Sequence, residues 1–197
     1  MRVSKEKAEQ NRQQILSAAA RLFREQGIEA TGVDAITDRA GLTHGSLYSQ
    51  FGSKEAVTAE AILFASTRSK RAWQGPAEDK QGKPALRGVV ERYLAPAHRD
   101  APGHGCVIAA LGADIARQPK AVRQAFTKAL KGALDVIAGL MPAKDREEKA
   151  IAAFAAMVGA LILARAVDDE ALSELILKAT AKRVIDLADG PKRVRRS

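Results

Sequence analysis

The sequence has a single cysteine, no apolar segment long enough for a typical membrane span, and no apolar leader at its N-terminus. One cysteine excludes an intrachain disulfide, which fits a protein of the reducing cytoplasm. The longest apolar run, Ala150 to Ala164, is closed by Lys149 and Arg165. Because a bilayer span needs about 20 residues, this run predicts a buried helix. The start, MRVSKEKAEQNRQQ, lacks the apolar core of a signal peptide.

Sequence motifs of catalysis are also missing. There is no glycine-rich phosphate loop, no HExxH and no GxSxG. A cysteine nucleophile needs a base and an orienting group within reach. Cys106 and His104 are two positions apart at the start of an expected helix, a spacing that does not make them face each other. The sequence therefore predicts a protein that is not an enzyme and that needs no cofactor.

The composition is that of a globular protein, with 46% hydrophobic and 28% charged residues over 197 positions. This length suits one large domain or two small ones. The net charge is +9, but residues 1–55 carry eight Lys and Arg against seven Asp and Glu, a net of +1. The overall charge is therefore weak evidence for nucleic-acid binding, although a few well-placed cations are enough to contact phosphates.

Apolar residues recur at helical spacing along most of the chain, and no stretch alternates with period two. The prediction is an all-α fold of about nine helices. Segments 74–84 and 95–105 are rich in proline and glycine and predict loops. Asp168 or Asp169 is expected to cap the last helix. The expected helices cover about 9–26, 33–40, 44–51, 53–73, 85–94, 106–117, 119–140, 145–167 and 169–188.

The most informative stretch runs from Thr31 to Lys54. Apolar residues spaced three and four apart mark one face of a short helix: Val33, Ile36 and Ala40. Gly41 tolerates the positive φ that ends a helix sharply. Thr43 supplies an oxygen that can cap a second helix from His44, and Ser53 can cap a third. Two short helices joined by a glycine turn predict a helix-turn-helix.

Residues 11–57 closely resemble the DNA-binding domain of TetR/AcrR-type transcriptional regulators. The segments that carry the resemblance are NRQQILSAAARLFREQGIEAT, AGLTHGSLYSQF and GSKEAV. The resemblance implies a one-component repressor with a DNA-binding helix-turn-helix domain at 1–52 and a ligand-binding and dimerisation domain at 53–197. It also implies a homodimer on a palindromic double-stranded DNA operator, released by a small-molecule effector. The dimer interface would be a two-fold four-helix arrangement of the helices expected at 145–167 and 169–188.

In that family the second helix of the motif reads DNA, which implies a set of DNA-binding residues here. Glutamine suits adenine and short hydroxyls meet base edges, while Tyr48 resembles the family's phosphate-contacting tyrosine. His44 stands where many relatives have lysine. Lys54 and the free N–H groups at the start of its helix form an expected phosphate-binding site. Thr31 is expected to cap the helix that follows it and to touch the DNA backbone. The candidates are Thr31, Thr43, His44, Gly45, Ser46, Tyr48, Ser49, Gln50 and Lys54.

Purely structural roles remain open for several of these residues. In this alternative Thr31, Thr43 and Ser53 serve only as helix caps, and Tyr48 only covers the hairpin. The reading helix contains no arginine or lysine, so guanine contacts from it are expected to be scarce. The predicted site is read through DNA shape, methyl contacts and phosphates. A protein-interaction module that no longer binds DNA is the alternative that the near-neutral N-terminal segment leaves open.

A second cluster, with His98, Asp100, His104 and Cys106, falls within nine positions. One interpretation is a buried structural cysteine with surface histidines. Another is a thiol or electrophile sensor at Cys106, because a helix N-terminus stabilises a thiolate and the pair Gly105-Cys106 is similar to a feature of some family members that sense oxidants. The third is a metal sensor. Candidates for effector binding are Ile62, Ser66, Tyr93, Cys106 and Met157.

Overall fold

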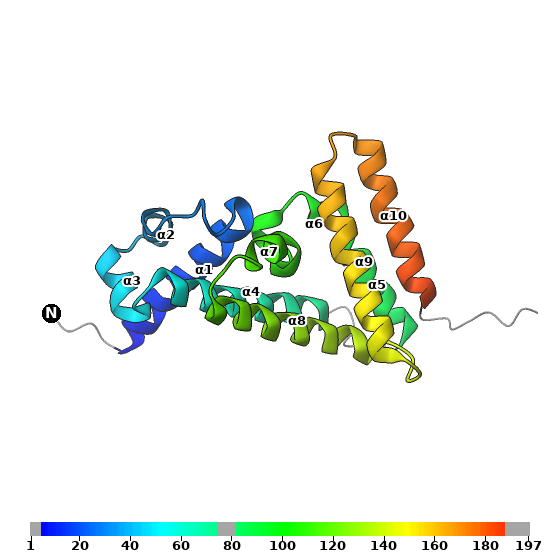
Figure 1. Ribbon diagram of the computed structural model, residues 1–197, viewed down its shortest axis with the longest axis horizontal. Coiled ribbons are helices and arrows are strands. Elements are labelled where there is room, and N and C mark those ends of the chain that lie inside the picture. The colour runs from blue at the N-terminus through cyan, green and yellow to red at the C-terminus, as the bar shows by residue number, and fades with distance from the viewer. Residues whose placement is uncertain (1–4, 75–81, 188–197) are drawn as a thin grey trace, which may run out of the picture. The chain divides into compact units, whose positions relative to one another are not determined.

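The computed structural model describes residues 5–74 and 82–187. Over these residues the chain forms ten α-helices and one short 3-10 helix, η2, with no strand (Figure 1), which confirms the prediction of an all-α fold. The elements are α1 (Lys5–Gln26), α2 (Val33–Ala40), α3 (His44–Phe51), α4 (Lys54–Gln74), α5 (Lys83–Tyr93), α6 (Pro96–Arg99), η2 (Pro102–His104), α7 (Val107–Ile115), α8 (Lys120–Leu140), α9 (Arg146–Ala166) and α10 (Glu170–Asp186).

Two predicted loops differ from the structure. The expected loop over 95–105 contains one helical turn, α6, and the 3-10 turn η2. Pro84 lies in the first turn of α5 and not in a loop. Proline is tolerated at the start of a helix because its missing N–H would have no intrahelical partner there. The rest of that expected loop, 75–81, and the expected helix end at residue 188 lie outside the described residues.

The chain divides into two compact units. The first comprises Met1–Ser69 and Pro102–Leu130, and the second Lys70–Ala101 and Lys131–Ser197. The first unit extends past residue 52 because η2 and α7 pack against α1. The predicted boundary between residues 52 and 53 separates a DNA-binding domain from a ligand-binding and dimerisation domain, and this functional division stays a prediction.

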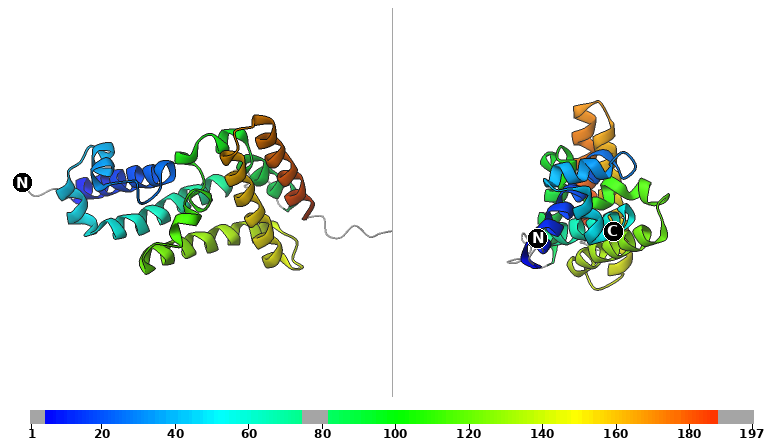
Figure 2. Two further views of the ribbon diagram at one scale, coloured as in Figure 1. Left: turned by 45° about the horizontal axis from the view of Figure 1, so that its top comes forward. Right: turned by 90° about the vertical axis from the view of Figure 1, so that its left-hand side faces the viewer.

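The core of the first unit is built around α1. Its predicted apolar stripe is buried, which confirms the helical periodicity: Ile15, Leu16, Ala19, Leu22 and Phe23. Helices α2 and α3 pack on α1 and on each other, as Figures 1 and 2 show for the blue and cyan segments. Ile36 of α2 and Leu47 of α3 are fully buried in this core. Burying side chains of this size contributes about 1.5–3 kcal/mol each, so the three helices form one packed support.

An aromatic cluster forms the core of the second unit. Trp73, Tyr93 and Phe154 meet edge to face, with ring centroids 5.6 Å apart for Trp73–Tyr93, 5.8 Å for Trp73–Phe154 and 6.1 Å for Tyr93–Phe154. The ring of His98 lies 4.8 Å from that of Tyr93, and its Nδ1 is 2.6 Å from the Tyr93 carbonyl oxygen. Burial lowers the pKa of His98, because a charged imidazole is disfavoured away from water.

Helix α9 is only half buried, so the prediction of a buried helix is wrong for one of its faces. One face packs into the unit through Ala150, Ala153, Phe154, Met157, Ala160, Leu161 and Ala164. The other face exposes Ile151, Ile162 and Leu163. By length and composition alone α9 could cross a membrane, although 39% of its most apolar window is buried inside the protein. The core helix of a soluble protein meets the same criterion.

Helix α10 packs along α9. Asp169 is the N-cap of α10, because its Oδ1 accepts from the Leu172 N–H at 3.0 Å. Of the two predicted caps, Asp168 and Asp169, the structure therefore uses Asp169. Two large apolar side chains of α10, Leu172 and Leu175, are exposed, as is Leu187 directly after the helix. The pair α9 and α10 therefore presents apolar surface on both helices.

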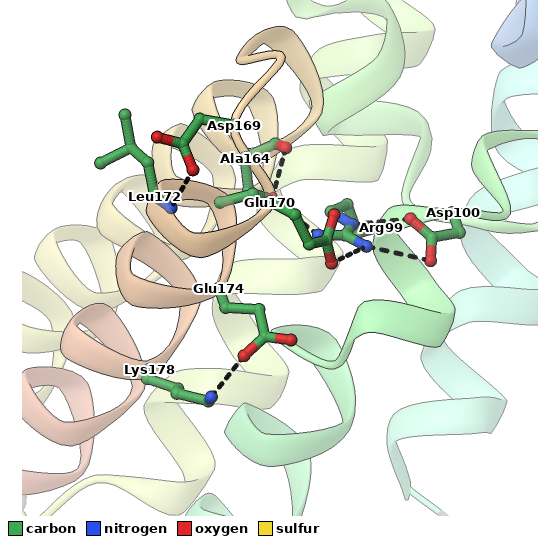
Figure 3. A network of polar contacts seen from close by, with 9 residues as sticks. Arg99, Asp100, Ala164, Asp169, Glu170, Leu172, Glu174 and Lys178 are labelled. Carbon is green, nitrogen blue, oxygen red and sulfur yellow. Dashed lines mark hydrogen bonds and ion pairs between the residues drawn. The ribbon is translucent and has the colours of Figure 1, made fainter.

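A polar network ties the start of α10 to α9 and α6 (Figure 3). Arg99 donates from Nη1 to Ser173 Oγ at 2.7 Å, and that hydroxyl donates to the Ala164 carbonyl oxygen at 2.7 Å. The same guanidinium pairs with Asp100 at 2.6 Å and with Glu170 at 2.9 Å. Hydrogen bonding to these carboxylates raises the pKa of Arg99 and lowers that of Asp100. The turn α6 is therefore fastened to the two helices by charge-assisted bonds.

Candidate nucleic-acid interface

The turn after α2 is set by Gly41, which has φ of 65° and lies in the left-handed region. Its N–H donates to the Asp38 carbonyl at 3.1 Å, and the Leu42 N–H donates to the Thr37 carbonyl at 3.0 Å. These bonds satisfy the last carbonyls of α2 and end the helix sharply. The prediction for Gly41 is confirmed.

Thr43 starts the second helix of the motif. Its backbone is extended, with φ of −98° and ψ of 160°, and its Oγ1 accepts from the Ser46 N–H at 3.3 Å. Ser53 has the same role one helix later, where its Oγ accepts from the Ala56 N–H at 3.1 Å. Both caps agree with the prediction, because a capping oxygen acts on an N–H only three residues away.

Helix α3 has a buried face and an exposed polar face. Leu47 is fully buried and Phe51 is buried on the inner side, where they anchor the helix in the core. The candidates on the opposite side remain accessible, with His44, Gly45, Tyr48 and Ser49 exposed and Ser46 and Gln50 half-buried. The Tyr48 side chain, 48% exposed, does not cover the hairpin.

Gly45 has no packing reason to be glycine. A Cβ atom built there would meet only Thr43 Oγ1, at 3.8 Å, which is ordinary van der Waals contact. The surrounding protein atoms therefore leave room for a side chain at position 45. The absence of one leaves the backbone of α3 open to close approach from outside, as the predicted DNA contact requires.

The imidazole of His44 contacts the Asp34 carboxylate of α2 through Nε2 and Oδ1. Its ring also lies 6.4 Å from that of Tyr48, tilted by 58°. Sequence reasoning missed Asp34, because a partner ten positions away across a turn leaves no periodic signal.

Lys54 is the first residue of α4 and is half-buried. The first N–H groups of a helix lack intrahelical partners, and the N-terminus favours negative charge. Ser53 satisfies only the Ala56 N–H. The start of α4 thus combines a cation with helix N–H groups, an arrangement suited to a phosphate.

Thr31 does not cap α2, so that prediction is wrong. The cap position is Gly32, which has no side chain. Thr31 is fully buried, and its Oγ1 donates to the Gly27 carbonyl at 2.7 Å. Gly27 ends α1 with φ of 86°, and Thr31 closes the turn that follows by bonding back to it. The hydroxyl is therefore directed inward, and we leave Thr31 out of the interface.

The candidates for effector binding lie in both units. Ile62 and Cys106 are buried in the first unit, where Ser66 is half-buried and donates to the Leu63 carbonyl at 2.8 Å. Tyr93 and Met157 are buried in the core of the second unit. Each side chain has a structural place in its own unit, and a role in ligand binding stays a prediction.

The metal alternative has no ligand set among residues 5–74 and 82–187, where no three His, Cys, Asp or Glu side chains are placed to hold an ion. His98 Nδ1 contacts the Tyr93 carbonyl, and Asp100 pairs with Arg99. The nearness of these residues in the sequence therefore does not produce a coordination site.

Residues 15–61 match the family model described as bacterial regulatory proteins, tetR family. These residues include the whole helix-turn-helix and the start of α4. The N-terminal part of the chain therefore contains a TetR-family domain. TetR-family proteins are transcription regulators and not enzymes.

Curated relatives match only part of the chain. The chain is 47% identical over 51 residues to the HTH-type transcriptional repressor KstR2 of Rhodococcus jostii (strain RHA1), covering 26% of this chain and 25% of the relative. It is 26% identical over 120 residues to the uncharacterized HTH-type transcriptional regulator YerO of Bacillus subtilis (strain 168), covering 60% of this chain and 41% of the relative. The chain thus spans less than half the length of these two relatives.

Solved structures resemble the chain over nearly its full length. The TetR-family regulator from Cytophaga hutchinsonii has a TM-score of 0.80 at 22% identity, covering 98% of this chain and 99% of that one. The reduced form of E. coli NemR has a TM-score of 0.78 at 17% identity, covering 92% of this chain and 98% of that one. At these identities the likeness shows a shared fold.

Proposed function

We propose that this protein is a cytoplasmic TetR-family transcriptional repressor that binds a palindromic DNA operator as a homodimer. The observation that carries the proposal is the face of α3, which is polar and accessible outside while Leu47 and Phe51 fasten it inside. A reading helix must project its side chains into the major groove from a rigid support. In the dimer the two α3 helices lie about 34–36 Å apart, or a multiple, to enter successive grooves.

The chemistry of α3 points to a site read with few guanine contacts. The helix offers hydroxyls, one amide and an imidazole that contacts Asp34, and it has no arginine or lysine. Gln50 suits adenine, and Tyr48 with the start of α4 suits phosphates. DNA shape and backbone contacts therefore supply much of the specificity.

The homodimer forms through α9 and α10. These helices and the residue that follows α10 expose six large apolar side chains: Ile151, Ile162, Leu163, Leu172, Leu175 and Leu187. Exposed small residues lie between them on α9 at Ala152, Ala155 and Ala156, and they permit close approach of a partner helix. Closed two-fold dimers bury such self-complementary patches. A two-fold four-helix interface accounts for all six side chains.

A small-molecule effector releases the operator by favouring a different spacing of the two α3 helices. The strength of such release is given by the coupling free energy between the effector site and the DNA-binding surface. Helix α4 is suited to carry it, because one continuous helix from Lys54 to Gln74 begins beside α3 and belongs to both units.

We expect the purified protein to bind the DNA flanking its own gene tightly and saturably in a gel shift, with affinity that falls log-linearly with salt. Lys54→Ala should weaken binding to all sequences and reduce the salt slope by about one, because it removes one phosphate contact. Lys128→Ala, an exposed lysine of α8 in the same unit, is the control and should leave the slope unchanged. If selection from random DNA also yields no preferred sequence, the protein-interaction alternative replaces the proposal.

A thiol sensor at Cys106 is the second candidate, supported by Arg24. Cys106 occupies the N-cap position of α7 and is buried, and Arg24 interacts with it electrostatically. Burial lowers the pKa of Arg24 to about 10, which leaves the guanidinium charged at neutral pH. A nearby cation stabilises a thiolate. N-ethylmaleimide should then reduce operator affinity in the wild type and not in Cys106→Ser; complete alkylation, checked by mass, with unchanged affinity would reject this candidate.

A further inference from the structure

One side chain of α1, Arg12, joins three helices of the first unit. Its Nη1 donates to the Gln50 carbonyl oxygen at 3.1 Å, and its Nη2 forms an ion pair with the Glu60 carboxylate of α4. Its guanidinium carbon lies 4.3 Å from the centroid of the Phe51 ring. The guanidinium therefore contacts α3 twice and α4 once.

The two contacts on α3 fall on its last two residues. The last carbonyls of a helix have no intrahelical partner, and a cation is favourable at this end of the helix dipole. Phe51 is the buried anchor of α3, and a cation over its ring adds an attraction. Arg12 thus fixes the C-terminal end of α3, while the Thr43 cap fixes the N-terminal end.

The contact on α4 gives the same guanidinium a second attachment. The side chains of Arg12 and Glu60 are 28% and 39% exposed, so the pair is partly shielded from water. Charged pairs at intermediate exposure are screened less than surface pairs. A shift of α4 that moves Glu60 must either break this pair or displace Arg12 and, with it, its contact on Gln50.

We propose that Arg12 is a positioning residue that sets the orientation of α3 and links it to α4. The inference rests on the proposed function, because α3 is taken as the helix that reads DNA. Arg12 touches the inner end of α3 through a backbone carbonyl and a buried ring, so its role is exerted through α3 and not through contact with bases.

The chain offers a matched control on the same helix. Arg21 of α1 pairs with Glu25 of α1, Nε to Oε1, at 2.7 Å. Arg21 thus contacts neither α3 nor α4, although Glu25 also pairs with Arg39 of α2 at 3.3 Å. Arg21→Gln and Arg12→Gln remove the same charge from the same helix, so they differ in the link to α3 and α4.

The experiment uses fluorescence anisotropy to compare each variant's affinity for the operator obtained by selection from random DNA with its affinity for an unrelated duplex of the same length. The temperature is one at which circular dichroism shows that each variant is folded. Arg12→Gln should lower operator affinity about tenfold and change non-specific affinity far less, since base contacts depend on the orientation of α3 and phosphate contacts do not. The operator affinity of Arg12→Lys should lie between those of the wild type and Arg12→Gln, because lysine keeps the positive charge but lacks the planar guanidinium with its several N–H donors. Arg21→Gln should preserve the ratio of the two affinities.

Hydrogen exchange of the free protein tests the same link without DNA. Arg12→Gln should raise exchange at the amides of α3 about tenfold relative to those of α7, and Arg21→Gln should not. A folded Arg12→Gln protein with an unchanged affinity ratio and unchanged α3 exchange overturns the inference. If the wild type shows no sequence preference while α3 exchange rises as expected, the proposed function fails and the positioning role stands.

Discussion

Replacing Leu163 and Leu175 together with glutamate is expected to convert the dimer to a monomer and to lower operator affinity at least about 100-fold. These side chains are 56% and 61% exposed and lie on α9 and α10. In a two-fold interface each glutamate appears twice, and an unpaired buried charge costs about 3–5 kcal/mol. Loss of the dimer also removes the joint binding of two half-sites. Light scattering after gel filtration measures the mass, and anisotropy measures the affinity.

Ala121→Glu with Thr127→Glu is the control for this experiment. Both positions are exposed on α8, and the pair adds the same two negative charges. This control should remain dimeric and keep most of its operator affinity. A Leu163→Glu, Leu175→Glu protein that stays dimeric would place the interface on another surface and contradict the α9–α10 assignment.

Phe154→Ala is expected to destabilise the second unit by about 3–5 kcal/mol, the usual range for removing a buried aromatic ring. Phe154 is almost completely buried, and its ring contacts those of Trp73 and Tyr93. The deletion removes one member of the cluster and leaves a cavity that the remaining rigid rings fill poorly. Guanidinium denaturation followed by the fluorescence of Trp73 measures the loss as a lower midpoint.

Phe154→Leu separates the loss of aromatic contact from the creation of a cavity. Leucine keeps most of the volume, so we expect a cost near 1–1.5 kcal/mol. Equal midpoints for wild type and Phe154→Ala would show that the cluster does not support the unit. At low temperature, where each variant is folded, operator binding should persist because α3 belongs to the first unit.

The local features of the helix-turn-helix could be predicted from the sequence. Gly41, Thr43 and Ser53 act on backbone groups within about four residues, so their roles depend on residue type and spacing alone. The buried stripe of α1 follows from the helical period in the same way. The all-α fold and the exposed face of α3 rest on these local rules.

The features that join helices were decided by tertiary structure. Arg12 meets Gln50 and Glu60 across 38 and 48 positions, and His44 meets Asp34 across a turn. Thr31 suited a cap by its type and place, yet the turn after Gly27 directs its hydroxyl inward. Periodicity indicates which face of a helix is apolar but not what packs on it, so the half-exposed α9 was predicted to be buried. Partners distant in sequence are chosen by packing, whereas caps and turns are determined by their neighbours in the chain.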